Sequence, residues 1–161
     1  MTEAFQPERD QLRSEIDLLL RELQVGHDFE RTAIHYSEVA ALTNPKTVSI
    51  TADRGWQSSG LLLQSGSNCL ITAMGRTVLA KKPKPWDSEP QGITIRYCEG
   101  QPLGQLQAIL LDQKSNRFGK VIPIGLSATI VVQSTATLFL RVNDYAAELA
   151  DNTGSYSVTV R

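Results

Sequence analysis

Residues 138–160 read LFLRVNDYAAELADNTGSYSVTV, and this stretch decides the fold class. Apolar and polar residues alternate at its two ends, over Thr137–Asn143 and over Tyr156–Arg161. A period of two is typical of a half-buried β-strand, because successive side chains point to opposite faces of a sheet. The pattern therefore predicts two strands joined by an acidic loop.

The first of these strands has two unequal faces. Leu138, Leu140 and Val142 form a face that is fit for burial. The opposite face is mostly polar and consists of Thr137, Phe139, Arg141 and Asn143. We expect the apolar face to point into a core.

Upstream, from Thr32 onward, short β-rich runs alternate with Gly, Pro, Asn and Ser, and no second long helical pattern occurs. This texture favours an all-β fold, an antiparallel β-sandwich or jelly roll, over residues 47–161. The expected strands are Ala33–Val39, Thr47–Ala52, Gly60–Gln64, Asn68–Met74, Gln105–Leu111, Val121–Pro123, Ala128–Gln133, Thr137–Asn143 and Tyr156–Arg161.

Residues 1–46 are expected to form a helical arm with a connecting segment. One amphipathic helix is predicted between Glu8 and Leu23, with Pro7 at its start and Gly26 beyond its end. Its apolar stripe is Leu12, Ile16, Leu19, Leu20 and Leu23. A stripe of this length either packs on its own domain, which we favour, or pairs with a copy of itself to give a homo-oligomer.

Composition narrows the classes of function. The 161 residues are 41% hydrophobic and 20% charged, as in a folded globular protein, and carry a formal net charge of -1. Without a positive field, no nucleic-acid partner is expected. No apolar run approaches the ~20 residues that cross a bilayer, so no membrane insertion is expected.

No motif of catalysis stands out. The patterns GxSxG, HExxH, GxGxxG and the P-loop are missing from the sequence, and we expect no enzymatic activity. Cys69 and Cys98 lack CxxC spacing, and buried free thiols are favoured over a disulfide. For His27 and His35 a surface or capping role is favoured over a role as a ligand.

A proline-rich stretch, Arg76–Gly92, is expected to be a long irregular loop, because Pro83, Pro85 and Pro90 exclude a helix or central strand. Loops of this length are more often functional than short ones. Trp86 within it is either a platform for stacking a sugar or a hydrophobic pin that anchors the loop. The residue alone favours the pin.

The acidic loop between the last two strands offers hard oxygen ligands. Asp144, Glu148 and Asp151 supply three carboxylates, and Asn143 and Asn152 add two amides within ten residues. Calcium takes six to eight oxygens from such groups. The spacing is not that of an EF-hand, so the composition leaves two alternatives, a calcium site and a solvated acidic loop.

The chain over roughly residues 50–161 resembles the LecA-like family, the calcium-dependent galactophilic lectins of bacteria. The resemblance lies in an ordered series of sequence blocks. The last block consists of a strand that ends in Asn-Asp, a short loop, two adjacent ligand residues and a final strand. The blocks are GWQSSGLLLQSG (55–66), ITAMG (71–75), PLGQLQAILLD (102–112), VIPIG (121–125) and LFLRVNDYAAELADNTGSYSVTV (138–160). The resemblance implies a galactose-binding-like jelly roll.

The resemblance also implies a set of calcium ligands. Asp144 takes the place of the family's calcium-binding aspartate, and Asp151 and Asn152 take the place of an Asn-Asn pair. Backbone oxygens are implied at Glu148 and near Leu79. Asp151 adds negative charge where the family has an amide.

In the family, the calcium ion itself receives two adjacent sugar hydroxyls. The resemblance therefore implies that Asp144, Asp151 and Asn152 also border the sugar, and that Gln91 contacts its exocyclic hydroxyl. The family's neighbouring histidine is missing, since Ser88, Glu89 and Pro90 precede Gln91 here. This departure bears on galactose specificity more than on calcium binding.

Two functional hypotheses follow. The first is a calcium-dependent carbohydrate-binding module for galactose or another vicinal-diol sugar. The alternative is a structural or assembly module in which any calcium only stabilises the C-terminal loop. A weak calcium site fills only where calcium is abundant, so the first hypothesis favours an extracellular, cell-surface or periplasmic location.

Overall fold

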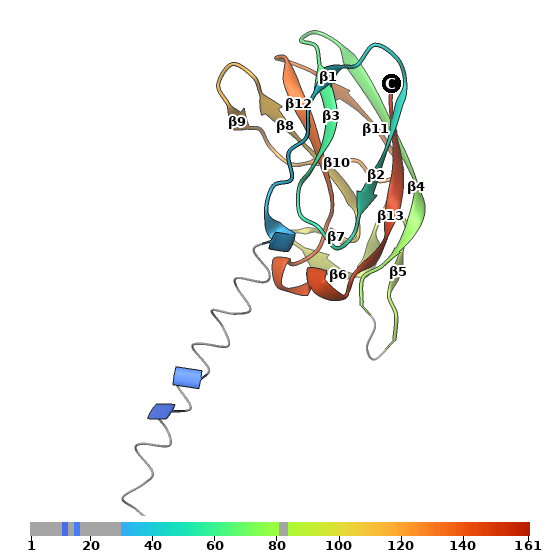
Figure 1. Ribbon diagram of the computed structural model, residues 1–161. Helices are drawn as coiled ribbons and strands as arrows, with labels where there is room; N and C mark the ends of the chain where they lie inside the picture. The colour runs from blue at the N-terminus through green and yellow to red at the C-terminus, as the bar shows by residue number, and fades with distance from the viewer. Residues whose placement is uncertain (1–10, 13–14, 17–29, 81–83) are drawn as a thin grey trace, which may run out of the picture.

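A computed structural model describes residues 11–12, 15–16, 30–80 and 84–161 (Figure 1). The strands are β1 Ala40–Ala41, β2 Lys46–Thr51, β3 Gln57–Leu63, β4 Asn68–Val78, β5 Asp87–Ser88, β6 Ile93–Cys98, β7 Gln101–Leu103, β8 Leu106–Asp112, β9 Arg117–Phe118, β10 Ile122–Pro123, β11 Ser127–Val131, β12 Ala136–Val142 and β13 Thr153–Val160. A 3-10 helix, η1, spans Ala146–Asp151. The predicted all-β fold is confirmed.

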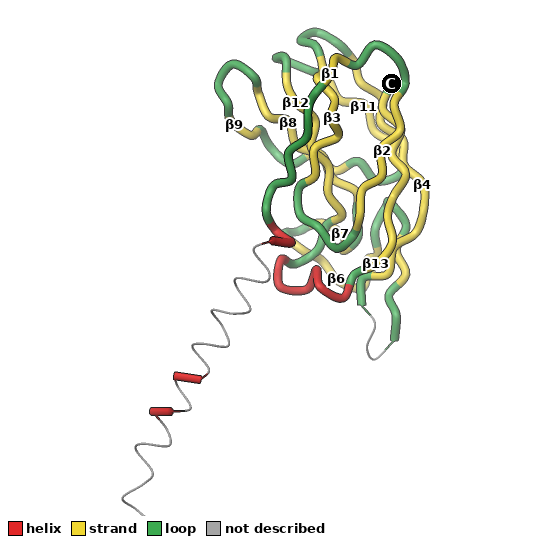
Figure 2. The backbone as a smooth tube through the Cα atoms, in the orientation of Figure 1, coloured by secondary structure: helices red, strands yellow, loops and turns green. Residues whose placement is uncertain are grey.

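Two sheets form the sandwich. The first has the order β1-β3-β12-β8-β10, with β9 paired to β8, and the second has the order β11-β4-β13-β2, with β5 paired to β4. All strand pairs are antiparallel except β1 with β3. The β6–β7 hairpin and η1 lie together at one end of the sandwich (Figures 1 and 2).

The core lies between the two sheets and uses the alternation of the last two strands. In β12 the inward residues are Leu138, Leu140 and Val142, and each is at most 1% exposed. The inward residues of β13, Tyr156, Val158 and Val160, are fully buried in the same cluster. Burying an apolar side chain of this size contributes about 1.5–3 kcal/mol, so these alternating positions stabilise the pairing of the sheets.

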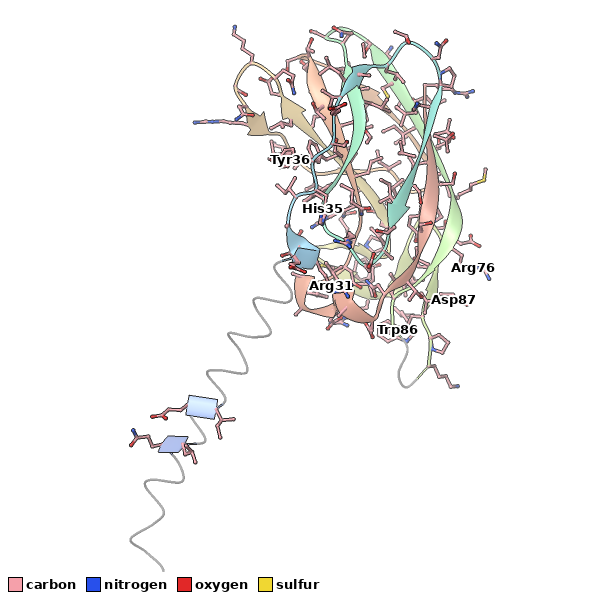
Figure 3. All side chains as sticks on the ribbon, viewed as in Figure 1. Arg31, His35, Tyr36, Arg76, Trp86 and Asp87 are labelled. Atoms are coloured by element: carbon pink, nitrogen blue, oxygen red, sulfur yellow. The ribbon has the colours of Figure 1, made fainter. Side chains whose placement is uncertain are left out.

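The other face of β12 is also buried, although its sequence is mostly polar. Phe139 is 0% exposed and forms a second apolar cluster with Ile109 and Leu111 on the outer side of the first sheet. The ring of Tyr36 meets Phe139 edge-on at 5.4 Å, and the ring of Phe118 does so at 5.3 Å. Tyr36 reaches this face from the segment that precedes β1 (Figure 3). A strand in the middle of a covered sheet has no solvent face.

The segment before β1 follows the edge of the first sheet. His35 makes a parallel bridge to Gln57, and its backbone donates to Trp56 and accepts from Ser58, both at 2.8 Å. Arg31 pairs with Asp53 at 3.3 Å. These contacts bind the segment to the sandwich, while the domain boundary after residue 46 stays a prediction.

Two expectations about local structure are wrong, and one hairpin was not expected. Residues 33–39 form only the bridge at His35 instead of a strand, because this edge segment pairs through a few residues. Residues 93–98 and 101–103 form β6 and β7, which had no expected counterpart. The stretch 76–92 is partly regular, since β4 continues to Val78 and pairs with β5. Pro85 and Pro90 lie outside the paired residues of this short ladder and do not interrupt it.

Most of the predicted helix, Glu8–Leu23, lies outside the described residues, as do Pro7, Gly26 and His27. Among the residues that are described, no helix is long and apolar enough to cross a membrane. The N-terminal arm and its self-pairing therefore stay predictions.

Both cysteines are buried free thiols, as predicted. Cys69 lies in the core on β4, and Cys98 ends β6. Burial raises the pKa of each thiol. A raised thiol pKa disfavours the reactive thiolate, so a structural role fits both residues.

Asp112 closes the turn after β8 and makes the stability of the fold pH-dependent. Its carboxylate accepts hydrogen bonds from the hydroxyls of Ser134 and Ser115 and from the backbone N–H groups of Ser115 and Lys114. These bonds lower the pKa of Asp112 to about 2. A carboxyl with a lowered pKa stabilises the fold above its ordinary pKa, and this contribution disappears as the pH falls from about 4 to about 2.

Asp112→Asn is therefore expected to lower the thermal midpoint at pH 7 and to have a much smaller effect at pH 2. Thermal unfolding followed by circular dichroism at both pH values measures this. Asp87→Asn, at an exposed position on β5, is the matched control and should differ little from wild type. An equal deficit of Asp112→Asn at both pH values would contradict the role assigned to its charge.

Candidate functional site

The acidic loop connects the central strands of the two sheets. β12 ends at Val142, η1 spans Ala146–Asp151, and β13 begins at Thr153. The loop therefore lies at one end of the sandwich, beside β6 (Figure 1). The loop begins at β12 of the first sheet and ends at β13 of the second sheet. Its two ends, at Asp144 and Asn152, lie within hydrogen-bond distance of each other.

Asp144 and Asn152 form a buried polar pair. The Nδ2 of Asn152 donates to Oδ2 of Asp144 at 2.7 Å and to the backbone oxygen of Ala52 at 3.1 Å. The other carboxylate oxygen of Asp144 accepts from the backbone N–H of Tyr145 at 2.7 Å. Asp144 is 6% exposed and Asn152 is 3% exposed. Desolvation by burial raises the pKa of Asp144, against the opposing effect of these hydrogen bonds.

One oxygen of this pair lacks a donor. Because the amide nitrogen of Asn152 is committed to two acceptors, its Oδ1 is the atom left over, and it is buried without a hydrogen-bond partner among the described residues. A buried oxygen without a donor costs free energy, which a cation would recover. Asp144 and Asn152 thus fit a site for a hard cation.

Asn143 fixes the position of Asp144. Its side-chain nitrogen donates to the backbone oxygens of Cys98, Gln101 and Pro102 at 3.1, 3.3 and 3.0 Å. The β6–β7 hairpin is therefore tied to the end of β12. The carboxylate that follows in sequence is held by backbone contacts on both sides.

Leu79 directly follows the last residue of β4. In the ladder of β13 with β4, the terminal pair is Thr153 with Val78, so Leu79 and Asn152 each lie one residue beyond that pair. Leu79 itself is buried, and its N–H donates to the backbone oxygen of Trp86 at 2.9 Å. The backbone oxygen of Leu79 stays a predicted ligand.

The two remaining acidic residues are not gathered with Asp144. Asp151 is exposed at the end of η1. The carboxylate of Glu148 makes an ion pair with Arg96, with nitrogen–oxygen distances of 2.6 and 2.9 Å. Across the described part of the chain, no three His, Cys, Asp or Glu residues form a cluster that could hold a metal ion. Any cation here depends on amide and backbone oxygens together with Asp144.

The implied sugar-contacting residues come from the 86–92 segment. Gln91 is exposed, and its amide donates to Glu89 at 3.2 Å, while Arg76 pairs with the other oxygen of Glu89. Trp86 is half-buried and packs against the main core, in agreement with its interpretation as a pin (Figure 3). Two residues further along the chain, the hydroxyl of Ser88 lies 3.2 Å from that of Tyr156, which anchors the segment to the core.

Asp144 has a path to solvent. A depression of about 280 Å³ opens beside it, with Trp56, Arg141 and Tyr145 also in its walls. The guanidinium of Arg141 stacks on Trp56 at 4.6 Å and pairs with Glu99 at 2.9 Å. A small ion or a sugar hydroxyl can therefore reach the neighbourhood of the buried carboxylate.

Arg96 is the residue that the sequence did not indicate as part of the site. It lies on β6, whose Ile93, Ile95 and Tyr97 alternate with more polar residues ahead of the Glu99-Gly100 turn. Both turn residues have positive φ, 52° and 76°, as in tight hairpin turns. Recognising this hairpin in the sequence would have placed Arg96 on a strand, although not opposite Glu148.

The chain and its fold can be compared with known proteins. No family model and no curated protein matches the chain. A solved structure described as the EclA N-terminal domain, a PllA-like lectin, is similar with a TM-score of 0.54 and 26% sequence identity. The match covers 71% of this chain and 92% of that chain. This protein therefore has a lectin-like all-β sandwich fold.

Proposed function

We propose that this protein is a carbohydrate-binding module without enzymatic activity, and that it binds its sugar through a calcium ion on the acidic loop. The buried Asp144–Asn152 pair, with one oxygen that lacks a donor, is the observation that carries the proposal. Its place at the end of a lectin-like sandwich supports a sugar as the ligand.

The chain offers ligands of the kind that calcium prefers. Asp144 supplies a carboxylate, and Asn152 supplies the buried amide oxygen. We propose that the exposed side chain of Asp151 turns toward the bound ion and adds a second carboxylate, and that the backbone oxygens of Glu148 and Leu79 complete the set. The bound ion would supply open coordination positions for two adjacent hydroxyls.

The 86–92 segment would provide the rest of the sugar contacts. Gln91 is exposed in the connection between β5 and β6 and would present its amide to a hydroxyl. Its present partner, Glu89, is also exposed and adds a hydrogen-bond acceptor. Trp86 is committed to the core on one side, so its contribution to sugar stacking is secondary to its packing. A vicinal diol is the feature of the sugar that this arrangement selects.

Thermal unfolding in chelator, in calcium and in magnesium tests the metal. A ligand that binds only the folded state at 100 times its dissociation constant stabilises it by about 2.7 kcal/mol, so calcium is expected to raise the midpoint by roughly 5–10 °C. Magnesium should have a smaller effect, because it requires stricter octahedral geometry.

Asp144→Asn keeps the shape of the side chain and removes its charge. Both carboxylate oxygens of Asp144 accept hydrogen bonds, so the amide of the variant places a donor against the N–H of Tyr145 or of Asn152. The variant should therefore be somewhat less stable than wild type in chelator, and it should lose the calcium shift. Asp87→Asn is the control and should keep the shift. An unchanged midpoint in millimolar calcium would contradict a calcium site and favour the structural or assembly module.

Sugar binding is a separate test. On a glycan array, the wild-type protein is expected to bind glycans with accessible vicinal hydroxyls in calcium and to lose them in chelator. Gln91→Ala should weaken binding to the glycans that the wild-type protein recognises, without changing the calcium-induced rise of the thermal midpoint. A calcium shift without binding to any glycan would leave the ion with a structural role alone.

A further inference from the structure

We propose that Arg96 on β6 holds the acidic loop in its cation-binding shape before a cation arrives. This inference rests on the proposed function, since it concerns the loop that carries Asp144 and Asn152. Arg96 is a positioning residue that acts through Glu148 and Tyr145. Its role gives the β6–β7 hairpin a function as a clamp on the site.

Arg96 contacts the loop in two ways. Its two terminal nitrogens bind the two carboxylate oxygens of Glu148 at 2.6 and 2.9 Å. Its guanidinium also lies over the ring of Tyr145, 4.7 Å from the ring centre. A bidentate ion pair fixes direction as well as distance, and stacking adds a second constraint. Arg96 thereby contacts both the entry of the loop and the middle of η1.

A third contact joins the same two elements. The hydroxyl of Tyr145 donates to the backbone oxygen of Tyr97 at 2.7 Å. The Tyr145 ring is therefore held on its face by Arg96 and at its tip by the next residue of β6. Since Tyr145 follows Asp144 directly, these contacts limit the rotation of the backbone that carries the carboxylate.

The base of the clamp is itself attached to β12. Cys98, two residues after Arg96, accepts a hydrogen bond from the buried side chain of Asn143. β6 is thus tied to β12 on one side of Asp144, while Arg96 holds the loop on the other side. The attachment consists of the short side chain of Asn143 and the backbone of β6, so the strand that carries the long Arg96 side chain is held in place.

Removal of Arg96 has two opposing effects on the affinity of the site for a cation. Arg96 is a positive group near Asp144, and removing a positive charge would by itself favour a cation. Loss of the clamp acts in the opposite direction, because the loop must then be ordered when the ion binds. Residues that orient metal ligands typically affect affinity by about 10–100-fold.

We therefore expect Arg96→Gln to weaken calcium binding by about 10–100-fold, although it removes a positive charge. Isothermal titration calorimetry with calcium measures this. Arg96→Lys keeps the charge but loses the bidentate fork, and should fall between Arg96→Gln and wild type. Arg76→Gln breaks the exposed pair with Glu89 outside the loop and serves as the control with unchanged affinity.

Hydrogen exchange of the metal-free protein tests the clamp without any cation. The amides of residues 144–152 are expected to exchange slowly in wild type and faster in Arg96→Gln. Glu148→Gln breaks the same ion pair and retains the backbone oxygen of Glu148, so it should speed exchange in the same amides. Exchange in β13 should remain as in wild type, which separates loop release from unfolding.

The outcomes distinguish the two proposals. If wild type does not bind calcium, the proposed function fails, and exchange alone decides whether Arg96 holds the loop. Equal or tighter calcium binding by Arg96→Gln, with unchanged exchange in the loop, would overturn the clamp while leaving the calcium site intact.

Discussion

Phe139→Ala is expected to lower the free energy of unfolding by about 3–5 kcal/mol, the cost of truncating a fully buried phenylalanine. Phe139 is 0% exposed and lies at the centre of the second apolar cluster. Its removal leaves a cavity between the first sheet and the segment that contains Tyr36. The segment is expected to loosen as well, because the edge-on ring contact with Phe139 is lost.

Urea unfolding measures this loss, and hydrogen exchange of residues 34–41 measures the loosening. Val131→Ala is the control, because Val131 is a β-branched strand residue that is 61% exposed. Its effect should stay within about 0.5 kcal/mol, as for most surface positions. If Phe139→Ala cost no more than Val131→Ala, the outer face of β12 would not be a second core.

Asn143→Asp is expected to destabilise the protein by about 3–5 kcal/mol at pH 7, the scale for a buried charge left without compensation. The substitution preserves volume but replaces the amide donor with an acceptor. Three backbone oxygens, from Cys98, Gln101 and Pro102, would then face a carboxylate. The β6–β7 hairpin should separate from β12, and the calcium response should disappear with the displaced Asp144.

Urea unfolding and the calcium thermal shift test both consequences. Asn68→Asp makes the same chemical change at an exposed position on β4 and should leave stability and the calcium response near wild type. Equal stability of the two variants would show that the amide of Asn143 is not needed to attach the hairpin.

Local sequence patterns were sufficient to predict most strands of the sandwich. The expected strands at 47–52, 68–74 and 137–143 coincide with β2, β4 and β12 to within a few residues. Each has a burial pattern that follows from alternation or from a short apolar run bounded by turn residues. The expected strand at 33–39 failed because an edge segment makes few ladder bonds, and such pairing depends on its neighbour.

The candidate site could be predicted only in part. The composition of residues 143–152 indicated oxygen ligands, but it did not separate Asp144 and Asn152, which are buried together, from exposed Asp151. Burial depends on what covers a residue. For Glu148, the covering group is Arg96, which lies 52 positions away in the sequence.

The sequence by itself determined the all-β class, the positions of most strands and the acidic loop between the last two, because period-two alternation and turn residues act over a few neighbours. Only the tertiary structure decided that Phe139 is buried, that Asn152 keeps an oxygen without a donor, and that Arg96 binds Glu148. Each of these features depends on contacts between segments that are distant in the sequence. The free energy of such contacts arises only when the whole domain packs, so no local run of residues determines it.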